Sequence, residues 1–468
     1  MTVHRLSRQL ESGDAGPPMP VGCAVDGSGL TVTSCDGIDA LERFAAEIDR
    51  FNLAAARPNP FMSAAFLRCY AMHCEYQNPG LEERLYLIHD GRQLIGCAPL
   101  RRSVDRFGPE KIPLGLHGRR FQLLAPLDTE QPGILSEPGD EERVARALLR
   151  HLVEQDEDWG LLDMVGQRHG GVLHRVAHAM VDHRFRVRDI AVEPYNEIAL
   201  VWPDLPAYVR SLAKKMRSNL ARQTRRLFAA GTLQLVLAEG SAAVAPWLDA
   251  YCELDARSWK HGTAASISRN PRRIRYYREI VAGRGGLEPG FVGILLDGVL
   301  VASQITGGNA AAAPGRHGTW LLETAYDQYY GELGPGSLVL LLAVGEAIRR
   351  GDRHLNFMQN FAYYKHRWGA DPVDVVSVQV IRRRSLHNAR ALLGDARRRL
   401  LAPKYAAMRA AGTIEEVEIR DADPGASVAR VDLRQAQACA AAALRSAGPG
   451  VRLLDREQAK LHLPFSLP

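Results

Sequence analysis

The chain has 468 residues, which is enough for about two to four domains of ordinary size. With 46% hydrophobic, 24% charged and 7% aromatic residues, its composition excludes a largely disordered protein. The 59 lysines and arginines outnumber the 53 acidic residues slightly, so the net charge of +6 permits an anionic ligand but does not by itself indicate nucleic acid.

The first half of the chain alternates helical and strand-like segments after an opening rich in Gly, Pro and Ser. Two strand-like segments flank the tight-turn dipeptide Asp90-Gly91, which predicts a β-hairpin. The apolar periodicity predicts a short strand at 29–32, helices from 37 and at 63–73, hairpin strands at 84–89 and 93–101, a strand at 121–126, a helix at 141–155 and a strand at 160–165.

The second half repeats this order, with a second hairpin around Asp297-Gly298. The predicted elements are helices at 212–230 and 245–259, hairpin strands at 291–296 and 300–306, a strand at 320–326, a helix at 337–350, and strands at 354–358 and 373–382. The repeat predicts two copies of one α/β domain. We divide the chain into a flexible N-terminal arm (1–34), a first domain (35–200), a second domain (201–385) and a C-terminal helical extension and tail (386–468).

The cysteines and the apolar runs indicate the compartment. The seven cysteines include no CxxC pair, which disfavours a disulfide framework or a structural zinc site. Cys69, His73 and Cys74 lie close together, but a fourth ligand at matching spacing is missing, so we expect no bound metal. The opening residues lack the apolar core of a signal peptide, and no apolar run approaches the roughly 20 residues of a membrane span. These features predict a cytoplasmic protein.

Two segments of the second half have the chemistry to bind an anion. The predicted helix that starts near Lys214 carries a dense row of cations, including Arg217, that suits a phosphate, a carboxylate or a nucleic-acid backbone, although a solvated helix face explains it equally simply. The turn Gly334-Pro335-Gly336-Ser337 leads directly into an apolar helix, whose free N–H groups suit a pyrophosphate. Ser337 as a plain N-cap is the alternative. The turn matches neither a Walker A nor a Rossmann motif.

Two further segments combine cations with aromatic side chains. Residues 356–369 place Tyr364, Lys365 and Trp368 after a buried strand end, which in α/β folds often faces a ligand, although a packing corner would have the same composition. Residues 253–260 end a helix with carboxylates, Trp259 and Lys260. Neither a GxSxG nor an HExxH signature occurs.

Taken in order, these segments resemble GNAT-superfamily acetyltransferases of the CelD type, which are associated with cellulose and exopolysaccharide production. The similarity is carried by the cationic helix from Lys214, "ARSWK" at 256–260, "DGVLVASQI", "YDQYYGELGPGSLVLLLAVGEAIRRG" at 326–351 and "HLNFMQNFAYYKHRWGA" at 354–370. The chain departs from the family where a serine-proline-glycine turn is replaced by Gly334-Pro335-Gly336, and where an acidic residue is replaced by Asn356. The plan is also similar to that of Fem-type aminoacyl transferases, which carry two such domains in tandem.

The resemblance implies two tandem GNAT-like domains, each a mixed central sheet flanked by helices, and acyl transfer from an acyl-CoA to an amine or hydroxyl of a small molecule or sugar. It implies a donor site in the second half only, since the first half has no equivalent of the glycine turn. The implied donor contacts are Gly334, Pro335, Gly336, Ser337, Lys214 and Arg217. The implied catalytic residues are Glu323 as general base, with Asp327 and Asp255 as rivals, and Lys365 for negative charge. The implied acceptor contacts are Trp259, Lys260, Tyr326, Asn360, Tyr364 and Trp368.

Two alternatives remain open. A Fem-type transferase would use aminoacyl-tRNA as its donor, although no long helical insertion lies between Leu227 and Trp320. A binding or regulatory protein could keep the fold without the chemistry, which the Asn356 replacement permits. Steep weakening of binding by salt would distinguish a tRNA ligand from a small one.

Overall fold

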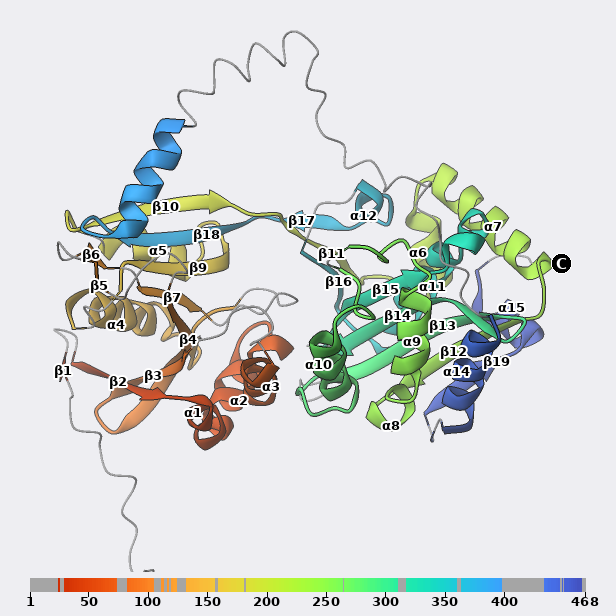
Figure 1. Ribbon diagram of the computed structural model, residues 1–468, viewed down its shortest axis with the longest axis horizontal. Helices are drawn as coiled ribbons and strands as arrows, with labels where there is room; N and C mark the ends of the chain where they lie inside the picture. The colour runs from red at the N-terminus through yellow and green to blue at the C-terminus, as the bar shows by residue number, and fades with distance from the viewer. Residues whose placement is uncertain are drawn as a thin grey trace, which may run out of the picture.

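The protein consists of two mixed β-sheets, each flanked by helices, that lie side by side along the long axis (Figure 1). The computed structural model describes residues 24–25, 29–73, 82–104, 111–112, 116–117, 119–123, 132–155, 159–180, 182–263, 265–309, 317–359, 363–397, 433–446, 448 and 450–464. The predicted fold class, a tandem of mixed sheets with flanking helices, is confirmed. Among the described residues, no helix combines the length and the apolar character that a membrane crossing requires.

The first sheet has the strand order β1-β2-β3-β4-β7-β9-β18-β10, with β8 paired to β4. Its strands are β1 (Ala24–Val25), β2 (Leu30–Asp36), β3 (Glu82–Asp90), β4 (Gln93–Val104), β7 (Arg119–Leu123), β8 (Leu135–Ser136), β9 (Leu161–Arg168), β10 (Phe185–Ala191) and β18 (Val375–Arg382). Its helices are α1 (Ile38–Arg43), α2 (Ala45–Ala54), η1 (Pro60–Met62), α3 (Ala64–His73), α4 (Glu141–Glu154) and α5 (Val172–Met180). A separate small ribbon pairs β5 (Lys111–Ile112) with β6 (Leu116–His117).

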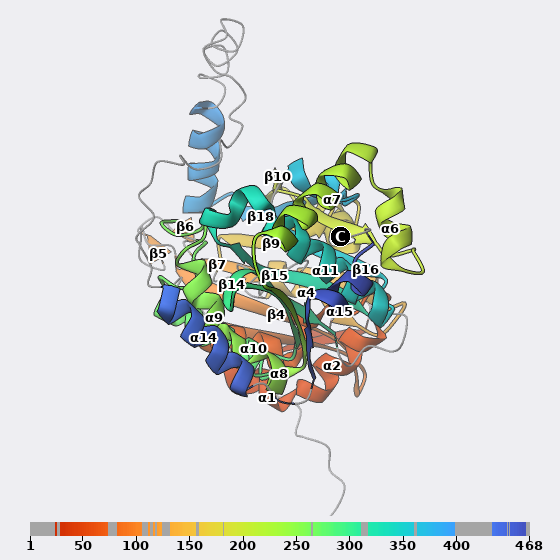
Figure 2. The same ribbon diagram turned by 90° about the vertical axis from the view of Figure 1, so that its right-hand side faces the viewer.

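The second sheet has the order β17-β11-β16-β15-β14-β13-β12-β19. Its strands are β11 (Tyr195–Ala199), β12 (Leu233–Glu239), β13 (Glu288–Leu296), β14 (Val299–Gly308), β15 (Gly318–Tyr326), β16 (His354–Gln359), β17 (Asp371–Val373) and β19 (Val451–Leu454). Its helices are α6 (Leu205–Ser211), α7 (Lys214–Ala229), α8 (Ser241–Val244), α9 (Trp247–Asp255), α10 (Pro271–Val281), η3 (Gln328–Leu333), α11 (Pro335–Arg350), α12 (Tyr363–Arg367), α14 (Leu433–Ser446) and α15 (Arg456–His462). In Figure 2, α6, α7 and α11 lie on one side of this sheet and α8 to α10 on the other.

The predicted repeat of elements is present in both sheets. In the first, an antiparallel hairpin (β3, β4) is followed by antiparallel β7, the helix α4 and the strand β9, which runs parallel to β7. In the second, β13, β14, β15, α11 and β16 follow the same order with the same directions. The hairpin turn of the second copy places both Asp297 and Gly298 at positive φ, 51° and 77°, as a tight two-residue hairpin turn requires.

Each sheet contains one strand from the other half of the chain. Strand β11 pairs with β16 and β17 in the second sheet, although it precedes residue 200. Strand β18 lies between β9 and β10 in the first sheet, although it follows the whole second repeat. For these two strands, sheet membership departs from the predicted limits of 35–200 and 201–385.

Both ends of the described chain add to the sheets. The strand predicted at 29–32 extends to Asp36 and is buried at Leu30 and Val32, whereas residues 1–23 of the predicted arm lie outside the described residues. At the other end, α14 packs against α9, and β19 pairs with β12 at the sheet edge. The described residues between 433 and 464 of the predicted extension therefore pack in the core of the second domain.

A shared apolar core joins the two domains. The ring of Phe61 in the first domain meets the ring of Trp320 on β15, with 5.8 Å between the centroids and an edge-to-face geometry. Arg57 also reaches across to Glu197 of β11, at 2.9 Å. This contact places the first domain against the strands β15 and β16, which carry the candidate site.

Candidate functional site

Strands β15 and β16 separate at their carboxyl ends. Their parallel ladder consists of three residue pairs, from Gly318 with His354 to Trp320 with Asn356. Beyond the last pair, β15 continues beside β14 and β16 continues beside β11. Beyond that pair, the facing backbone edges of β15 and β16 are therefore not paired with each other.

A β-bulge in β15 lies where the separation begins. Ile305 of β14 pairs with Glu323 and Thr306 pairs with Leu321, so Leu322 is the extra residue. The buried amide of Gln304 donates to the carbonyls of Ile305 and Glu323, at 2.8 and 3.0 Å, and accepts from Thr324. Bulges often occur beside active sites, where they redirect side chains and backbone groups.

The end of β16 is held in an uncommon backbone conformation. Met358 has φ of 61°, a left-handed geometry that side chains rarely adopt. The side-chain Oδ1 of Asn356 accepts from the Met358 N–H at 2.7 Å, and Nζ of the buried Lys365 donates to the backbone carbonyls of Phe357 and Met358 at 3.0 and 3.1 Å. The predicted catalytic Lys365 therefore supports the strand end with its own ammonium group.

The glycine turn leads into α11 beside β15. Gly334 caps the helix at φ 71°, and Pro335 occupies its first turn. A Cβ on Gly336 would lie 2.9 Å from Cδ1 of Tyr326, so the absence of a side chain lets the tyrosine ring approach the turn. The first turn of α11 contains no acidic residue. Its N-terminus therefore keeps the positive electrostatic character that favours an anion.

The equivalent helix of the first domain has the opposite character. Glu141 and Glu142 occupy the first turn of α4, and the carboxylate of Glu141 accepts from the N–H of Gly139 at 3.0 Å. Negative side chains at this end repel an incoming phosphate. Of these two equivalent helix ends, that of α11 is the one suited to an anionic donor.

Helix α7 borders the glycine turn through Gln223. A Cβ on Gly334 would lie 2.4 Å from Cδ of that side chain. Lys214 is nine residues earlier, about two and a half helical turns, and so lies on the opposite side of α7. The Arg217 guanidinium donates to the carbonyls of Arg210 and Leu212, at 3.0 and 2.6 Å. The structure thus brings neither predicted cation to the turn.

The exposed Arg226 is better placed, because it follows Gln223 by three residues and shares its side of the helix. Sequence reasoning did not single it out. Once one residue of α7 is known to contact the turn, helical periodicity identifies Arg226 as a neighbour on the same side of the helix.

Glu323 lies at the centre of a buried charge cluster on the α9 and α10 side of β15. It is 4% exposed. Its carboxylate forms an ion pair with Lys260, accepts from Arg273 Nη2 at 2.8 Å and accepts from the Tyr251 hydroxyl at 3.2 Å. Burial, together with the Glu323 charge, raises the pKa of Tyr251 well above its usual value. Two predicted site residues, Glu323 and Lys260, are therefore in direct contact.

The two rival carboxylates make other contacts. Asp327 pairs with Arg257 and caps η3 by accepting from the N–H of Tyr329 at 3.0 Å. Asp255 is fully buried and accepts through one oxygen from the hydroxyls of Ser266 and Ser268, at 2.6 and 2.8 Å. Both carboxylates fix the segment that joins α9 to α10.

The remaining predicted residues are spread around the opening. Trp259 is 42% exposed, and Nζ of Lys260 lies 5.9 Å from its ring centroid. Tyr364 is 44% exposed, with its ring centroid 6.3 Å from that of Phe357. Trp368 is buried in the core, where its carbonyl accepts from the Tyr208 hydroxyl at 2.7 Å. Asn360 lies outside the described residues, and Ser337 lies in the first turn of α11.

Comparison with known proteins agrees with this geometry. Residues 214–366 match the family model described as the acetyltransferase (GNAT) domain. The matched range runs from α7 to α12 and contains the separated strands, the bulge and the glycine turn. This segment is therefore similar to the GNAT acetyltransferase domain, and the first half of the chain repeats its order of elements.

Several solved structures are similar to this chain over about three quarters of its length. The crystal structure of FemX has 10% identity and a TM-score of 0.49, with coverage of 72% of this chain and 95% of that one. A tandem GNAT protein from the clavulanic acid biosynthesis pathway has 16% identity and a TM-score of 0.44, with coverage of 75% and 98%. L-PGS from Bacillus licheniformis has 11% identity and a TM-score of 0.42, with coverage of 76% and 95%. No curated protein matches the chain.

Proposed function

We propose that the protein is an acyltransferase that moves an acyl group from acyl-CoA to an amine or hydroxyl of a small molecule or saccharide. The observation that carries this proposal is the opening between β15 and β16, with the N-terminus of α11 at its mouth. The match of residues 214–366 to the GNAT acetyltransferase domain supports the same reaction.

In this proposal the backbone does most of the chemistry. The N-terminus of α11 holds the donor's pyrophosphate, since it is the positive end of the helix. Backbone N–H groups of β15 near the bulge polarise the thioester carbonyl and stabilise the oxyanion that develops during acyl transfer. The two domains hold donor and acceptor together, which contributes to the rate by positioning.

Glu323 stays our proposed general base, and its cluster suggests a second role. A base needs a lone pair that faces the acceptor, within about 2.6–3.2 Å of the proton that it removes. Both oxygens of Glu323 already accept from cations, Lys260 on one side and Arg273 on the other. In the second role, Glu323 orients Lys260 and the exposed ring of Trp259 beside it toward the acceptor. Lys365 is proposed as a positioning residue for the end of β16.

The saccharide acceptor and a place in exopolysaccharide or cellulose biosynthesis are proposals that follow the sequence resemblance alone. An aminoacyl-tRNA donor is the second candidate. The observation in its favour is the exposed cationic surface of α7, which includes Lys214, Lys215, Arg225 and Arg226. A polyanion would bind such a surface with a steep salt dependence. A binding protein without catalysis is the third candidate. It is supported by the contacts that Glu323 and Lys365 already make within the protein, with Lys260 and with the Phe357 carbonyl.

Calorimetric titration with acetyl-CoA, a long-chain acyl-CoA and free CoA tests the proposal. We expect saturable binding that Gly336→Asp abolishes, because the variant brings a negative charge and a side chain against Tyr326. Arg226→Ala should weaken binding about tenfold or more, as expected for the loss of a charged hydrogen bond, whereas the matched variant Lys214→Ala should leave it unchanged. Circular dichroism of each variant controls for folding. Absence of binding to every acyl-CoA would overturn the proposal.

A further inference from the structure

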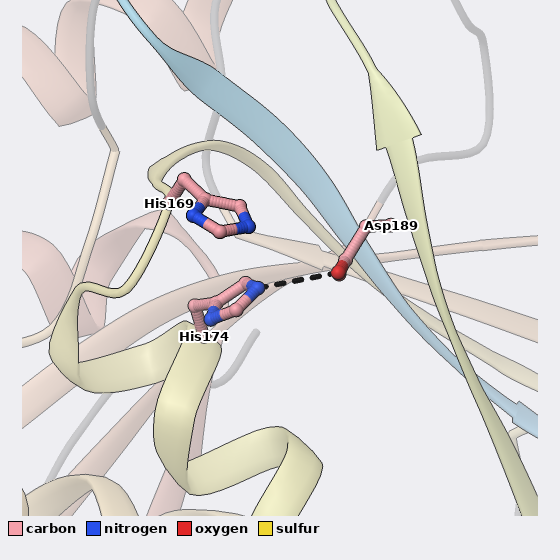
Figure 3. A group of neighbouring side chains, drawn as sticks. All are labelled: His169, His174 and Asp189. Atoms are coloured by element: carbon pink, nitrogen blue, oxygen red, sulfur yellow. Dashed lines mark hydrogen bonds and ion pairs between the residues drawn. The ribbon is translucent and has the colours of Figure 1, made fainter.

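A cluster of imidazole and carboxylate groups lies in the first domain, away from the separated strands. His169 comes from the turn after β9, His174 from α5 and Asp189 from β10 (Figure 3). One ligand atom from each residue lies within 4.8 Å of the other two. The three side chains therefore converge from three separate elements on one point.

The local backbone explains this convergence. Gly170 has φ of 72°, which lets the chain turn sharply after β9 and return His169 over the start of α5. The rings of His169 and His174 then lie 4.7 Å apart, centroid to centroid. His178 follows His174 by four residues, so both point from the same face of α5.

Asp189 faces this helix from the neighbouring strand. Side chains on a strand alternate between its faces, and Asp189 shares its face with Phe185 and Val187, which pack in the same core as α5. The flanking Arg188, on the other face, is paired with Asp395 at 3.1 Å. Arg188 therefore does not pair with the Asp189 carboxylate, which contacts the histidines of α5 instead.

The spacing of His174 and Asp189 fits two ligands of one transition-metal ion. Nε2 of His174 lies 3.2 Å from Oδ2 of Asp189. Two ligand atoms at about 2.0–2.1 Å from a tetrahedral zinc ion are separated by about 3.3 Å. Nε2 of His178 lies 3.0 Å from the other oxygen, Oδ1. A contact of this kind orients a metal-binding carboxylate and fixes which oxygen faces the ion.

We propose that His169, His174 and Asp189 bind one divalent transition-metal ion of the zinc type, with water in the remaining position and His178 as the residue that positions Asp189. Two imidazoles and a carboxylate are a ligand set that zinc accepts. The bound ion links the turn after β9 and helix α5 to β10, whose only ladder among the described residues is with β18. Its role is therefore to fasten an edge strand, and it is independent of acyl transfer in the second domain.

The segment around Cys69 and His73 is less suited to a metal ion than the histidine cluster. Cys69 is buried, and burial raises the pKa of its thiol to about 12. A protonated thiol is a poor zinc ligand. The histidine cluster has no thiol, and its residues His169 and Asp189 are exposed while His174 is partly exposed.

The test is a calorimetric titration of the tag-free, chelator-treated full chain with Zn²⁺ near pH 7.5, with the visible absorption of bound Co²⁺ as a second readout. We expect one ion per chain. His174→Ala and Asp189→Asn should each weaken binding about 100-fold or more, and His178→Ala about tenfold, as is typical for an outer partner. The exposed His183, outside the cluster, gives the matched control His183→Ala, which should bind like the wild type.

Circular dichroism and thermal unfolding of the metal-free variants separate loss of the site from loss of the fold. The proposal is overturned if the wild type binds no Zn²⁺ saturably. It is also overturned if His169→Ala, His174→Ala or Asp189→Asn, folded as the wild type, binds with unchanged affinity. Zinc should in addition raise the unfolding temperature of the wild type and not that of Asp189→Asn.

Discussion

Replacing Glu323 by glutamine tests whether the buried cluster holds the site together. The substitution keeps the shape of the side chain and removes its charge, while the Lys260 and Arg273 side chains that pair with it are 9% and 10% exposed. Removing one partner of a buried ion pair leaves an uncompensated buried charge, which typically costs about 3–5 kcal/mol. Here two cations lose their counter-charge, so we expect a loss within that range.

Urea unfolding followed by circular dichroism measures the loss. With a slope of about 3 kcal/mol per molar urea, a destabilisation of about 3 kcal/mol moves the midpoint by about 1 M. The double variant Glu323→Gln/Lys260→Met removes one of the stranded cations and should recover about 0.5–3 kcal/mol, the usual range of coupling between residues in contact. The reasoning is refuted if Glu323→Gln stays within about 1 kcal/mol of the wild type.

The same pair of variants, together with Lys260→Arg, separates the two proposed roles of Glu323. If Glu323 is the general base, both variants lack acyl transfer while acyl-CoA still binds. If Glu323 orients Lys260, the conservative variant Lys260→Arg, which keeps the ion pair, retains most of the turnover, and Glu323→Gln raises KM for the acceptor more than it lowers kcat.

Three further predictions concern the strand ends and the turn. Gly334→Ala should lower the stability of the folded protein by about 1–2 kcal/mol, because an alanine there must adopt the left-handed backbone conformation. Its Cβ would also displace the Gln223 side chain, so calorimetry should show weaker acyl-CoA binding. Unchanged affinity would contradict the assignment of this turn to the donor. Lys365→Met removes two hydrogen bonds at the end of β16 and should lower stability by about 1–3 kcal/mol in thermal unfolding, and equal stability would exclude the positioning role. Burial lowers the pKa of His354, so the unfolded chain binds a proton more readily than the folded one. Stability should therefore fall as pH drops below about 6.5, and His354→Gln should flatten the curve of urea midpoint against pH; an unaltered curve would show that His354 does not contribute.

The sequence predicts local elements well because local rules form them. Both hairpins have an aspartate-glycine turn between apolar strands, and α11 ends at Gly351 as expected, with φ of 76°. Two missed elements carried readable signals. Strand β12 alternates apolar residues between two glycines, and α10 begins with Asn270 as cap and Pro271 in its first turn.

No local pattern in the sequence indicates that β11 joins the second sheet and β18 the first, since strand pairing depends on contacts between distant segments. The same limit applies to the sites. Glu323 meets Lys260 and Arg273 across 63 and 50 residues of chain, and only the folded sheet brings them together. The His174 and His178 pair is visible as helical spacing, whereas the approach of Asp189 depends on how β10 packs.

The interleaved sheets have a consequence for synthesis. Strand β10 ends at residue 191, and its ladder partner β18 is complete only at residue 382. At about 5–20 residues per second, the ribosome needs roughly 10–40 s to make the chain between these points. During that interval the first sheet keeps an open edge on β9, and β10 has no strand to join. The half that is made first is therefore not finished until β18 follows the whole second repeat, and a nascent chain that stops near residue 370 leaves both sheets incomplete at once.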